Sequence, residues 1–169
     1  MGGIGGMNTM VLTLFLGIIN LMSATISLFL IDRMGRKKLL LFSQAGIVAG
    51  LTLLLLPRLF PTPAFFPLLA LIVFLFTYSI GLGPIPWVLI SEIYPLSIRA
   101  SAIACMTFLS WLSTFTVVFT FPYFLSSIGA TWTFLAYFLL SFSGFFLFRK
   151  IIPETKGKSL AEIELSLYS

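Results

Sequence analysis

Long apolar runs separated by short polar connections are the feature that most constrains how this chain can fold. A helix that crosses a bilayer needs about 20 apolar residues, and five runs approach that length: 7–31, 38–56, 66–90, 100–122 and 131–148. In hydrocarbon every backbone polar group must be paired within the protein, which a helix achieves along its own length. The sequence therefore predicts an all-α integral membrane protein with five transmembrane helices.

Composition agrees with a membrane-embedded chain and excludes several kinds of site. Charged residues make up 9% of the 169 residues and hydrophobic residues 59%, whereas soluble domains carry about a quarter charged residues. The chain contains no histidine and a single cysteine, Cys105, which excludes an internal disulfide, a histidine metal site and a Ser-His triad. Because no nucleophile–base pair, metal cluster or phosphate loop is found either, we predict no enzyme, metal or cofactor.

The distribution of charge indicates a membrane orientation rather than nucleic-acid binding, although the net charge is +5. Nine of the ten basic residues fall on one side of the predicted spans, and Arg58 falls on the other. The positive-inside rule places the side with nine in the cytoplasm. We therefore expect a multi-pass protein of the plasma membrane or bacterial inner membrane, with the N-terminus outside and a cytoplasmic tail at 149–169.

The third apolar run contains a pattern that interrupts a helix, Gly83-Pro84-Ile85-Pro86-Trp87. Each interior proline removes a backbone donor and crowds the preceding turn. The freed carbonyls need partners in protein or in a water-filled cavity, and broken helices often mark transporter binding sites. The pattern predicts a helix break at Pro84 and Pro86, which either lines a substrate cavity or only shapes packing.

Charged residues of opposite sign fall near the predicted cytoplasmic boundary. They include Asp32, Glu92 and Arg99, with a basic cluster at 33–38. The two carboxylates can pair with Arg99 or with the basic cluster, which would clamp helix ends in one conformation and release them in another. The alternative is simple interfacial anchoring, which composition alone favours.

Small and polar residues form stripes at helical spacing within the apolar spans. The stripes comprise Thr13, Gly17, Asn20, Ala24 and Ser27, then Ser79, Gly83 and Trp87, and then Thr107, Ser110 and Thr114 beside Trp111. Small residues permit close helix packing, and Asn20 can bond either a hydroxylated substrate or, more commonly, a neighbouring helix. Trp87 and Trp111 lie inside their runs rather than at the boundaries, where they either stack on a sugar ring or pack in a core.

Three segments resemble one transporter family. Residues 32–38, Asp-Arg-Met-Gly-Arg-Lys-Lys, resemble the D-R-x-G-R-[RK] loop of the major facilitator superfamily. Residues 83–99, with Gly-Pro-Ile-Pro-Trp, Ser-Glu-Ile-Tyr-Pro and Ile-Arg, resemble the tenth helix and following loop of its sugar porter family. Residues 153–164 resemble that family's tail signature, P-E-T-K-G-x-[ST]-[LF]-x-E-[IL]-E. In this order and spacing the motifs are specific, and the resemblance covers essentially the whole chain.

The resemblance implies that the five spans are helices eight to twelve of a twelve-helix sugar transporter, most of its C-terminal six-helix bundle, without the first seven helices. Such proteins bind monosaccharide-type sugars between two halves and work by alternating access, as facilitators or proton symporters. The implied partners are a sugar, the lipid bilayer and the missing N-terminal helices, and no nucleic acid. The implied substrate-binding positions are Asn20, Gly83, Trp87, Ser110 and Trp111. The implied conformational charge network consists of Asp32, Arg33, Gly35, Arg36, Glu92, Arg99 and Glu154.

The chain departs from the family pattern at two positions. Ser110 stands where Asn or Gln is common, and Ser79 stands where glucose facilitators carry a glutamate. Helix one, where proton symporters keep a titratable aspartate, is outside the sequence, so the mode of coupling stays open. The alternative to a transporter is a non-transporting membrane fragment or remnant that needs a separate N-terminal half.

Overall fold

The computed structural model describes residues 9–152 and 154–157, and this part of the chain is helical without strands. Five stretches of it are long and apolar enough to cross a membrane, with α3 and α4 together forming one of them. The prediction of an all-α membrane protein with five spans is therefore confirmed. The helices are α1 (Thr9–Met34), α2 (Arg36–Leu59), α3 (Phe66–Ile80), α4 (Ile85–Ile93), α5 (Leu96–Ser127) and α6 (Gly129–Ile151).

Most helices extend beyond the spans expected from hydropathy. Helix α1 continues through the charged pair at 32–33 and ends at Met34, so that only Gly35 separates it from α2. Helix α5 begins at Leu96, ends at Ser127 and includes Pro122. The difference arises because an apolar run stops at the first polar residues, whereas backbone hydrogen bonding continues into the interface until the chain turns.

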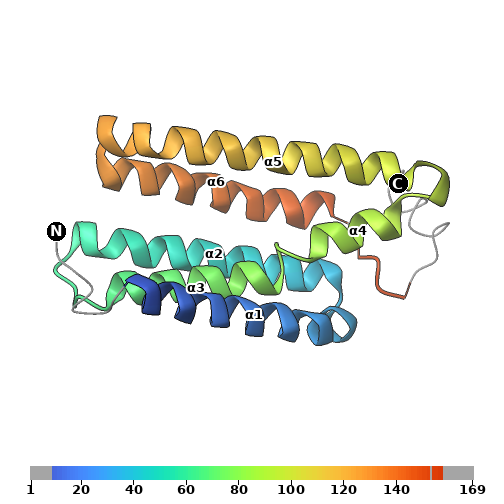
Figure 1. Cartoon of the computed structure of the whole chain (residues 1–169), viewed down its shortest axis with the longest axis horizontal. Coiled ribbons are helices and arrows are strands. Elements are labelled where there is room, and N and C mark those ends of the chain that lie inside the picture. The colour runs from blue at the N-terminus through green and yellow to red at the C-terminus, as the bar shows by residue number, and fades with distance from the viewer. Residues whose placement is uncertain (1–8, 153, 158–169) are drawn as a thin grey trace.

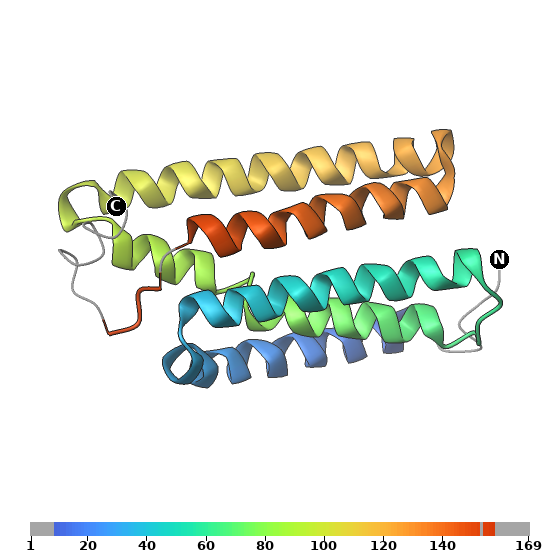
Figure 2. The same cartoon turned by 180° about the vertical axis from the view of Figure 1, so that it is seen from behind.

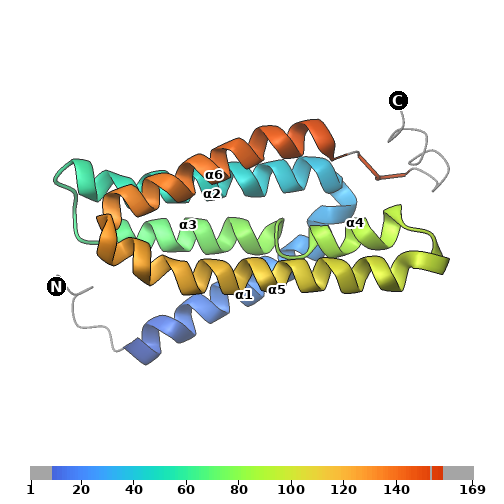
Figure 3. The ribbon, with the colours of Figure 1, turned by 90° about the horizontal axis from the view of Figure 1, so that it is seen from above.

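The helices form an open arc rather than a closed bundle (Figures 1 and 3). Following contacts between neighbours, the order is α5, α6, α2, α3 and α1, so α1 and α5 lie at the two ends of the arc. Helix α4 continues the line of α3 and packs against α5. None of the α5 side chains is buried by the described part of the chain.

The apolar core surrounds the interruption between α3 and α4. Its buried side chains come from the end of α1, the beginning of α2 and both sides of the interruption. They are Ile31, Leu39, Leu40, Ile80, Ile85 and Leu89. Burial of such side chains therefore holds the ends of four helices together at the point where the third span breaks.

The ends of the helices divide into two groups (Figures 1 and 2). The C-terminal ends of α1, α4 and α6 and the N-terminal ends of α2 and α5 lie together at one end of the molecule. This end carries the basic cluster at 33–38 together with Arg99, Arg149 and Lys150. Arg58 lies in the last turn of α2, at the opposite end. The charge asymmetry of the sequence is thus an asymmetry between the two ends of the fold.

Candidate functional site

The third span is interrupted at residues 81–84, between the end of α3 and the beginning of α4. In a continuous helix the amide of residue 84 would donate to the carbonyl of Ile80, but Pro84 has no N–H. The hydroxyl of Ser27, on α1, donates to that carbonyl at 2.5 Å. A side chain from another helix therefore supplies the hydrogen bond that the proline removes.

Ser43, on α2, pairs further backbone groups at the break. Its hydroxyl accepts a hydrogen bond from the amide of Leu82 at 3.0 Å and donates one to the carbonyl of Thr77 at 2.6 Å. The amide of Gly83 donates to the carbonyl of Tyr78 at 2.9 Å, one residue further back than in an α-helix. The prolines in the sequence predicted that freed backbone carbonyls need partners. They did not identify Ser43, which is marked in the sequence only as a hydroxyl residue within an apolar span.

The break also separates side chains that the sequence placed on one face. The common face of Ser79, Gly83 and Trp87 was expected only if the helix stayed regular through the prolines, and this condition is not met because the chain leaves helical geometry at 81–84. Ser79 is buried, and its hydroxyl has no hydrogen-bond partner among the described residues. Trp87, in contrast, is 41% exposed.

The packed face of α1 differs from the stripe read in the sequence. Its buried residues are Ser23, Ser27 and Ile31, and of these only Ser27 belongs to the stripe. A Cβ added at Gly17 would meet nothing within 4 Å, so no close packing occurs there among the described residues. Asn20 is exposed and makes no hydrogen bond to another described residue. The stripe and the packed face of α1 differ because periodicity identifies a small polar face but not the helix that it meets.

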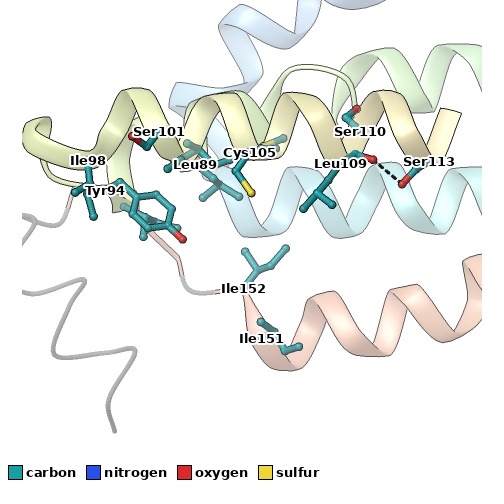
Figure 4. A pocket seen from close by; sticks show the side chains of 14 residues that line it. Leu89, Tyr94, Ile98, Ser101, Cys105, Leu109, Ser110, Ser113, Ile151 and Ile152 are labelled. Atoms are coloured by element: carbon teal, nitrogen blue, oxygen red, sulfur yellow. Dashed lines mark hydrogen bonds between the residues drawn. The ribbon is translucent and has the colours of Figure 1, made fainter. Parts of the chain in front are cut away.

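An open groove with a volume of about 880 Å³ lies between α4, α5 and the end of α6; its lining residues are drawn in Figure 4. Its lining is mainly apolar and includes Leu89, Leu109 and Ile152, with the polar side chains of Tyr94 and Ser110. Trp111 lines a different hollow on α5, together with Phe119 and Pro122. The structure therefore does not bring Ser110 and Trp111 into one pocket, although they are adjacent in sequence.

Arg36 is the centre of a charge cluster at the basic end of the molecule. Its Nε and Nη2 atoms both donate to Oε1 of Glu92, at 3.0 and 2.7 Å. Its Nη1 atom lies 3.5 Å from Oδ1 of Asp32, whose side chain is 79% exposed. The pair with Glu92 is the stronger one, because its side chains are only 16% and 27% exposed and solvent screens it less.

Glu154 joins the segment after α6 to the beginning of α2. Its Oε1 accepts hydrogen bonds from the backbone amides of Arg36 at 3.0 Å and Lys156 at 3.2 Å. A carboxylate is favourable there, because the first amides of a helix are unpaired and carry partial positive charge. Gly35 has φ 88°, and a Cβ at that position would lie 2.8 Å from Oε2 of Glu154. Glycine is therefore required by both the backbone angle and the approach of the carboxylate.

Two residues of the cluster were present in the tail signature but were not assigned a role. Thr155 donates from Oγ1 to Oε2 of Glu92 at 2.6 Å. Lys156 donates from Nζ to the backbone carbonyl of Arg33 at 2.7 Å, so the Arg33 contact shown here is through its main chain. The remaining signature positions, Pro153 and 158–164, and the rest of the predicted tail lie outside the described residues.

Arg99 does not join this cluster. Its Nε donates to the carbonyl of Tyr94 at 3.2 Å, and no ion pair connects it with Glu92 within the described ranges. The oxygens of Glu92 are already bonded to Arg36 and Thr155, and Arg99 lies on a separate helix after the turn at Pro95. Of the pairings considered from the sequence, the one with the basic cluster is the one formed.

The similarity of this chain to known proteins shows its family. The family model described as sugar (and other) transporter matches residues 2–167. The chain belongs to this transporter family. It is 33% identical to a putative metabolite transport protein, YwtG of Bacillus subtilis, over 98% of this chain and 37% of that protein. It is 36% identical to the facilitated trehalose transporter Tret1 of Bombyx mori, over 93% of this chain and 32% of that protein.

Solved transporters of the major facilitator superfamily share the fold. The inward-open xylose transporter XylE of E. coli superposes with a TM-score of 0.80 at 30% identity, covering 92% of this chain and 35% of that one. The proton:xylose symporter XylE bound to 6-bromo-6-deoxy-D-glucose gives a TM-score of 0.84 at 28% identity, covering 96% and 36%. The chain spans about a third of the length of the YwtG protein and of the Bombyx mori transporter, and 19% of the facilitated trehalose transporter Tret1 of Drosophila yakuba. These relatives are transporters rather than enzymes.

The Gly35–Glu154 contact predicts an unequal effect of two glycine substitutions. Gly35→Ala should lower the free energy of unfolding by about 1–3 kcal/mol for the strained φ, with a further loss from displacing the carboxylate. Gly129 also has a positive φ, 80°, but nothing lies within 4 Å of its added Cβ, so Gly129→Ala should show the first loss alone. Chemical unfolding of both purified variants measures the difference, and equal losses would contradict the role of Glu154.

Proposed function

We propose that this chain forms helices eight to twelve, most of the C-terminal bundle, of a monosaccharide-type sugar transporter that works by alternating access. The observation that carries the proposal is that the candidate substrate residues are exposed. They lie on α1, on α5 and on α4 of the broken span. Trp87 is 41% and Trp111 is 70% exposed, and Asn20 and Ser110 are exposed as well. The described part of the chain therefore leaves all four side chains accessible to further protein or to a ligand.

An uncovered carboxamide in an apolar span supports a cavity beside α1. Asn20 lies in the middle of a helix of 26 residues, and lipid offers its amide no hydrogen-bond partner. Leaving such a group unpaired in hydrocarbon is costly. Asn20 therefore faces a substrate, water or further protein in the complete transporter.

The chemistry of the exposed residues suits a sugar. An indole ring stacks on the apolar face of a pyranose, while amide and hydroxyl groups bond its hydroxyls. Several relatives carry names of trehalose or xylose transporters. The proposed substrate contacts are Trp87 and Asn20 first, with Gly83, Ser110 and Trp111 as further lining positions.

Further helices of the same transporter are the proposed partners on the α5 side. Helix α5 buries none of its side chains against the described chain, and the groove between α4, α5 and α6 is mainly apolar. In each half of a major facilitator two three-helix repeats are related by inverted topology. In the proposed arrangement α1 and α2 belong to the first repeat, and α3 with α4, α5 and α6 form the second. Helix α3 of the second repeat packs against α1 and α2 of the first. By symmetry, the helix that precedes α1 in the first repeat would pack against α5 and α6. A separate N-terminal half would supply the same helices if the chain acts as a fragment.

The charge cluster is the proposed device that controls conformation. Arg36, Glu92 and Glu154 connect the α1–α2 turn, α4 and the segment after α6. Glu92 follows Trp87 by five residues on α4, a displacement of about 7–8 Å at 1.5 Å per residue. One short helix therefore links a proposed sugar contact with the cluster. The role of Arg99 in the charge network stays a prediction, for another conformation of the transporter.

The proposed orientation follows from the charged end. The positive-inside rule places the α1–α2 turn, Arg99 and the C-terminus in the cytoplasm of a plasma or bacterial inner membrane. To test it, Cys105 is replaced by serine and single cysteines are introduced at Ser126 and Lys156, at opposite ends of the molecule. An impermeant maleimide should label only Ser126→Cys in intact cells. Labelling of Lys156→Cys from outside would overturn the orientation.

The proposed substrate site predicts a division of roles in the complete transporter. Trp87→Ala and Asn20→Ala should each weaken equilibrium sugar binding by about 1–3 kcal/mol, for a lost stack or hydrogen bond. Glu92→Gln should instead shift the inward–outward balance, because it leaves Arg36 partly buried without its partner. Trp132→Ala removes another exposed tryptophan and serves as the control that keeps full affinity.

Binding by isothermal calorimetry and state-specific cysteine labelling on these four variants separate the roles. Unchanged affinity in Trp87→Ala, or equal loss in Trp132→Ala, would contradict the sugar contact. A Glu92→Gln variant that loses binding while keeping the wild-type conformational balance would contradict the control function.

The alternating-access proposal also predicts that these 169 residues alone do not transport sugar, because a second bundle must move against them. Uptake of labelled sugar is measured in vesicles that hold the purified chain, and again after coexpression with the first seven helices of a sugar porter. Uptake by the chain alone would refute the proposal. Uptake only with the added helices supports the dependence on a separate N-terminal part.

A further inference from the structure

We propose that Ser27 and Ser43 are positioning residues for the broken span. Their hydroxyls replace backbone hydrogen bonds that the interrupted helix lacks, and they thereby hold α4 at a fixed angle to α3. Because α4 carries Trp87 and Glu92, these two serines set where the proposed sugar contact and the proposed conformational control lie. That last consequence rests on the proposed function, whereas the hydrogen-bonding role does not.

A comparison of two serines on α1 shows that the Ser27 contact is specific. Ser23 and Ser27 are both fully buried and lie one turn apart. Ser23 donates to the carbonyl of Ile19 at 2.6 Å, within its own helix. Ser27 donates across the interface to the carbonyl of Ile80, the acceptor that Pro84 leaves unpaired. Burial alone therefore does not explain the Ser27 bond.

Ser43 needs both the donor and the acceptor of a hydroxyl group. It accepts from Leu82 and donates to Thr77, which an alanine cannot do and a thiol does weakly. The site also demands a small side chain, because Gly81 packs so closely that an added Cβ would clash with Cβ of Ser43. Serine meets the size limit and the bonding requirement together.

The two serines come from different helices, so the break is held by contacts with both α1 and α2. Helix α1 contributes Ser27 and also carries Asn20, while α2 contributes Ser43 and begins with Arg36. Ser27 bonds the last residue of α3, and Ser43 bonds both Thr77 of α3 and Leu82 within the interruption. Two helices therefore fix the end of α3 and the short segment from which α4 begins. Loss of either bond frees α4 to tilt, and the proposed sugar contact then moves relative to the charge cluster.

A double-mutant cycle tests the replacement of the proline's missing donor. Hydrogen–deuterium exchange at residues 78–83 is measured in the full protein that carries this chain, reconstituted in lipid nanodiscs. Ser27→Ala should accelerate exchange on the order of tenfold, because the carbonyl of Ile80 loses its partner in an apolar site. In a Pro84→Ala background the new amide can donate to that carbonyl, so Ser27→Ala should then change exchange less than about twofold.

Ser23→Ala is the matched control, since it removes an equally buried hydroxyl one turn away and should show no coupling to Pro84→Ala. Equal acceleration by Ser27→Ala in both backgrounds, or coupling by Ser23→Ala, would overturn the proposal. If Ser27→Ala fails to assemble, recovery of assembly in the Pro84→Ala background supports the proposal, and failure in both contradicts it.

A second measurement separates positioning from simple stabilisation. Spin labels are attached to cysteines introduced at Phe76 on α3 and Ser91 on α4, with Cys105 replaced by serine. Ser43→Ala should broaden or shift the distance distribution between them, while Ser23→Ala should leave it unchanged. Faster exchange with an unchanged distance distribution would overturn the positioning role. Neither measurement uses sugar, so its outcome is independent of the binding experiments that test the proposed function.

Discussion

The rest of this structure depends on one constraint: backbone groups freed at an interrupted helix must be paired within the protein, because a membrane offers no water to bond them. Hydrocarbon offers no partner to a carbonyl freed by a proline. The break therefore requires neighbouring helices to bring hydroxyl groups to it, and it requires a glycine at position 81 so that those helices can approach. The apolar core gathers at the same place, so the break is the most constrained part of the molecule.

The charge cluster follows from that arrangement. Because α4 is short and starts at the break, its nine residues carry Glu92 to the end of the molecule where α2 begins. The Arg36 side chain pairs with the Glu92 carboxylate there, and Glu154 accepts a hydrogen bond from the amide of Arg36, the first residue of α2. Helix α4 thus begins at the break, where the hydroxyls of Ser27 and Ser43 bond the backbone, and ends at the charge cluster, where Glu92 pairs with Arg36.

Local chemistry explains what the sequence predicted and what it missed. Hydropathy, the sign of charges and the geometry of proline are properties of single segments, and they predicted the five spans, the interruption and the gathering of charge at one end. The partner of Glu92 and the packed face of α1 depend on how each helix is rotated against its neighbours. Periodicity therefore selected the face with Gly17, Asn20 and Ser27, whereas packing buries Ser23, Ser27 and Ile31, so that the two faces share only Ser27. Packing among the described residues does not decide the proposed substrate positions, because Asn20, Ser110 and Trp111 are exposed there.

The bond between Glu154 and the amide of Arg36 has a consequence for the order of assembly. It joins residues 118 positions apart, and Glu154 follows the six helices of the described part of the chain. During synthesis the α1–α2 turn is therefore made long before the carboxylate that occupies its amides. The charged end can therefore close around Arg36 only after α6 and Glu154 have been synthesised.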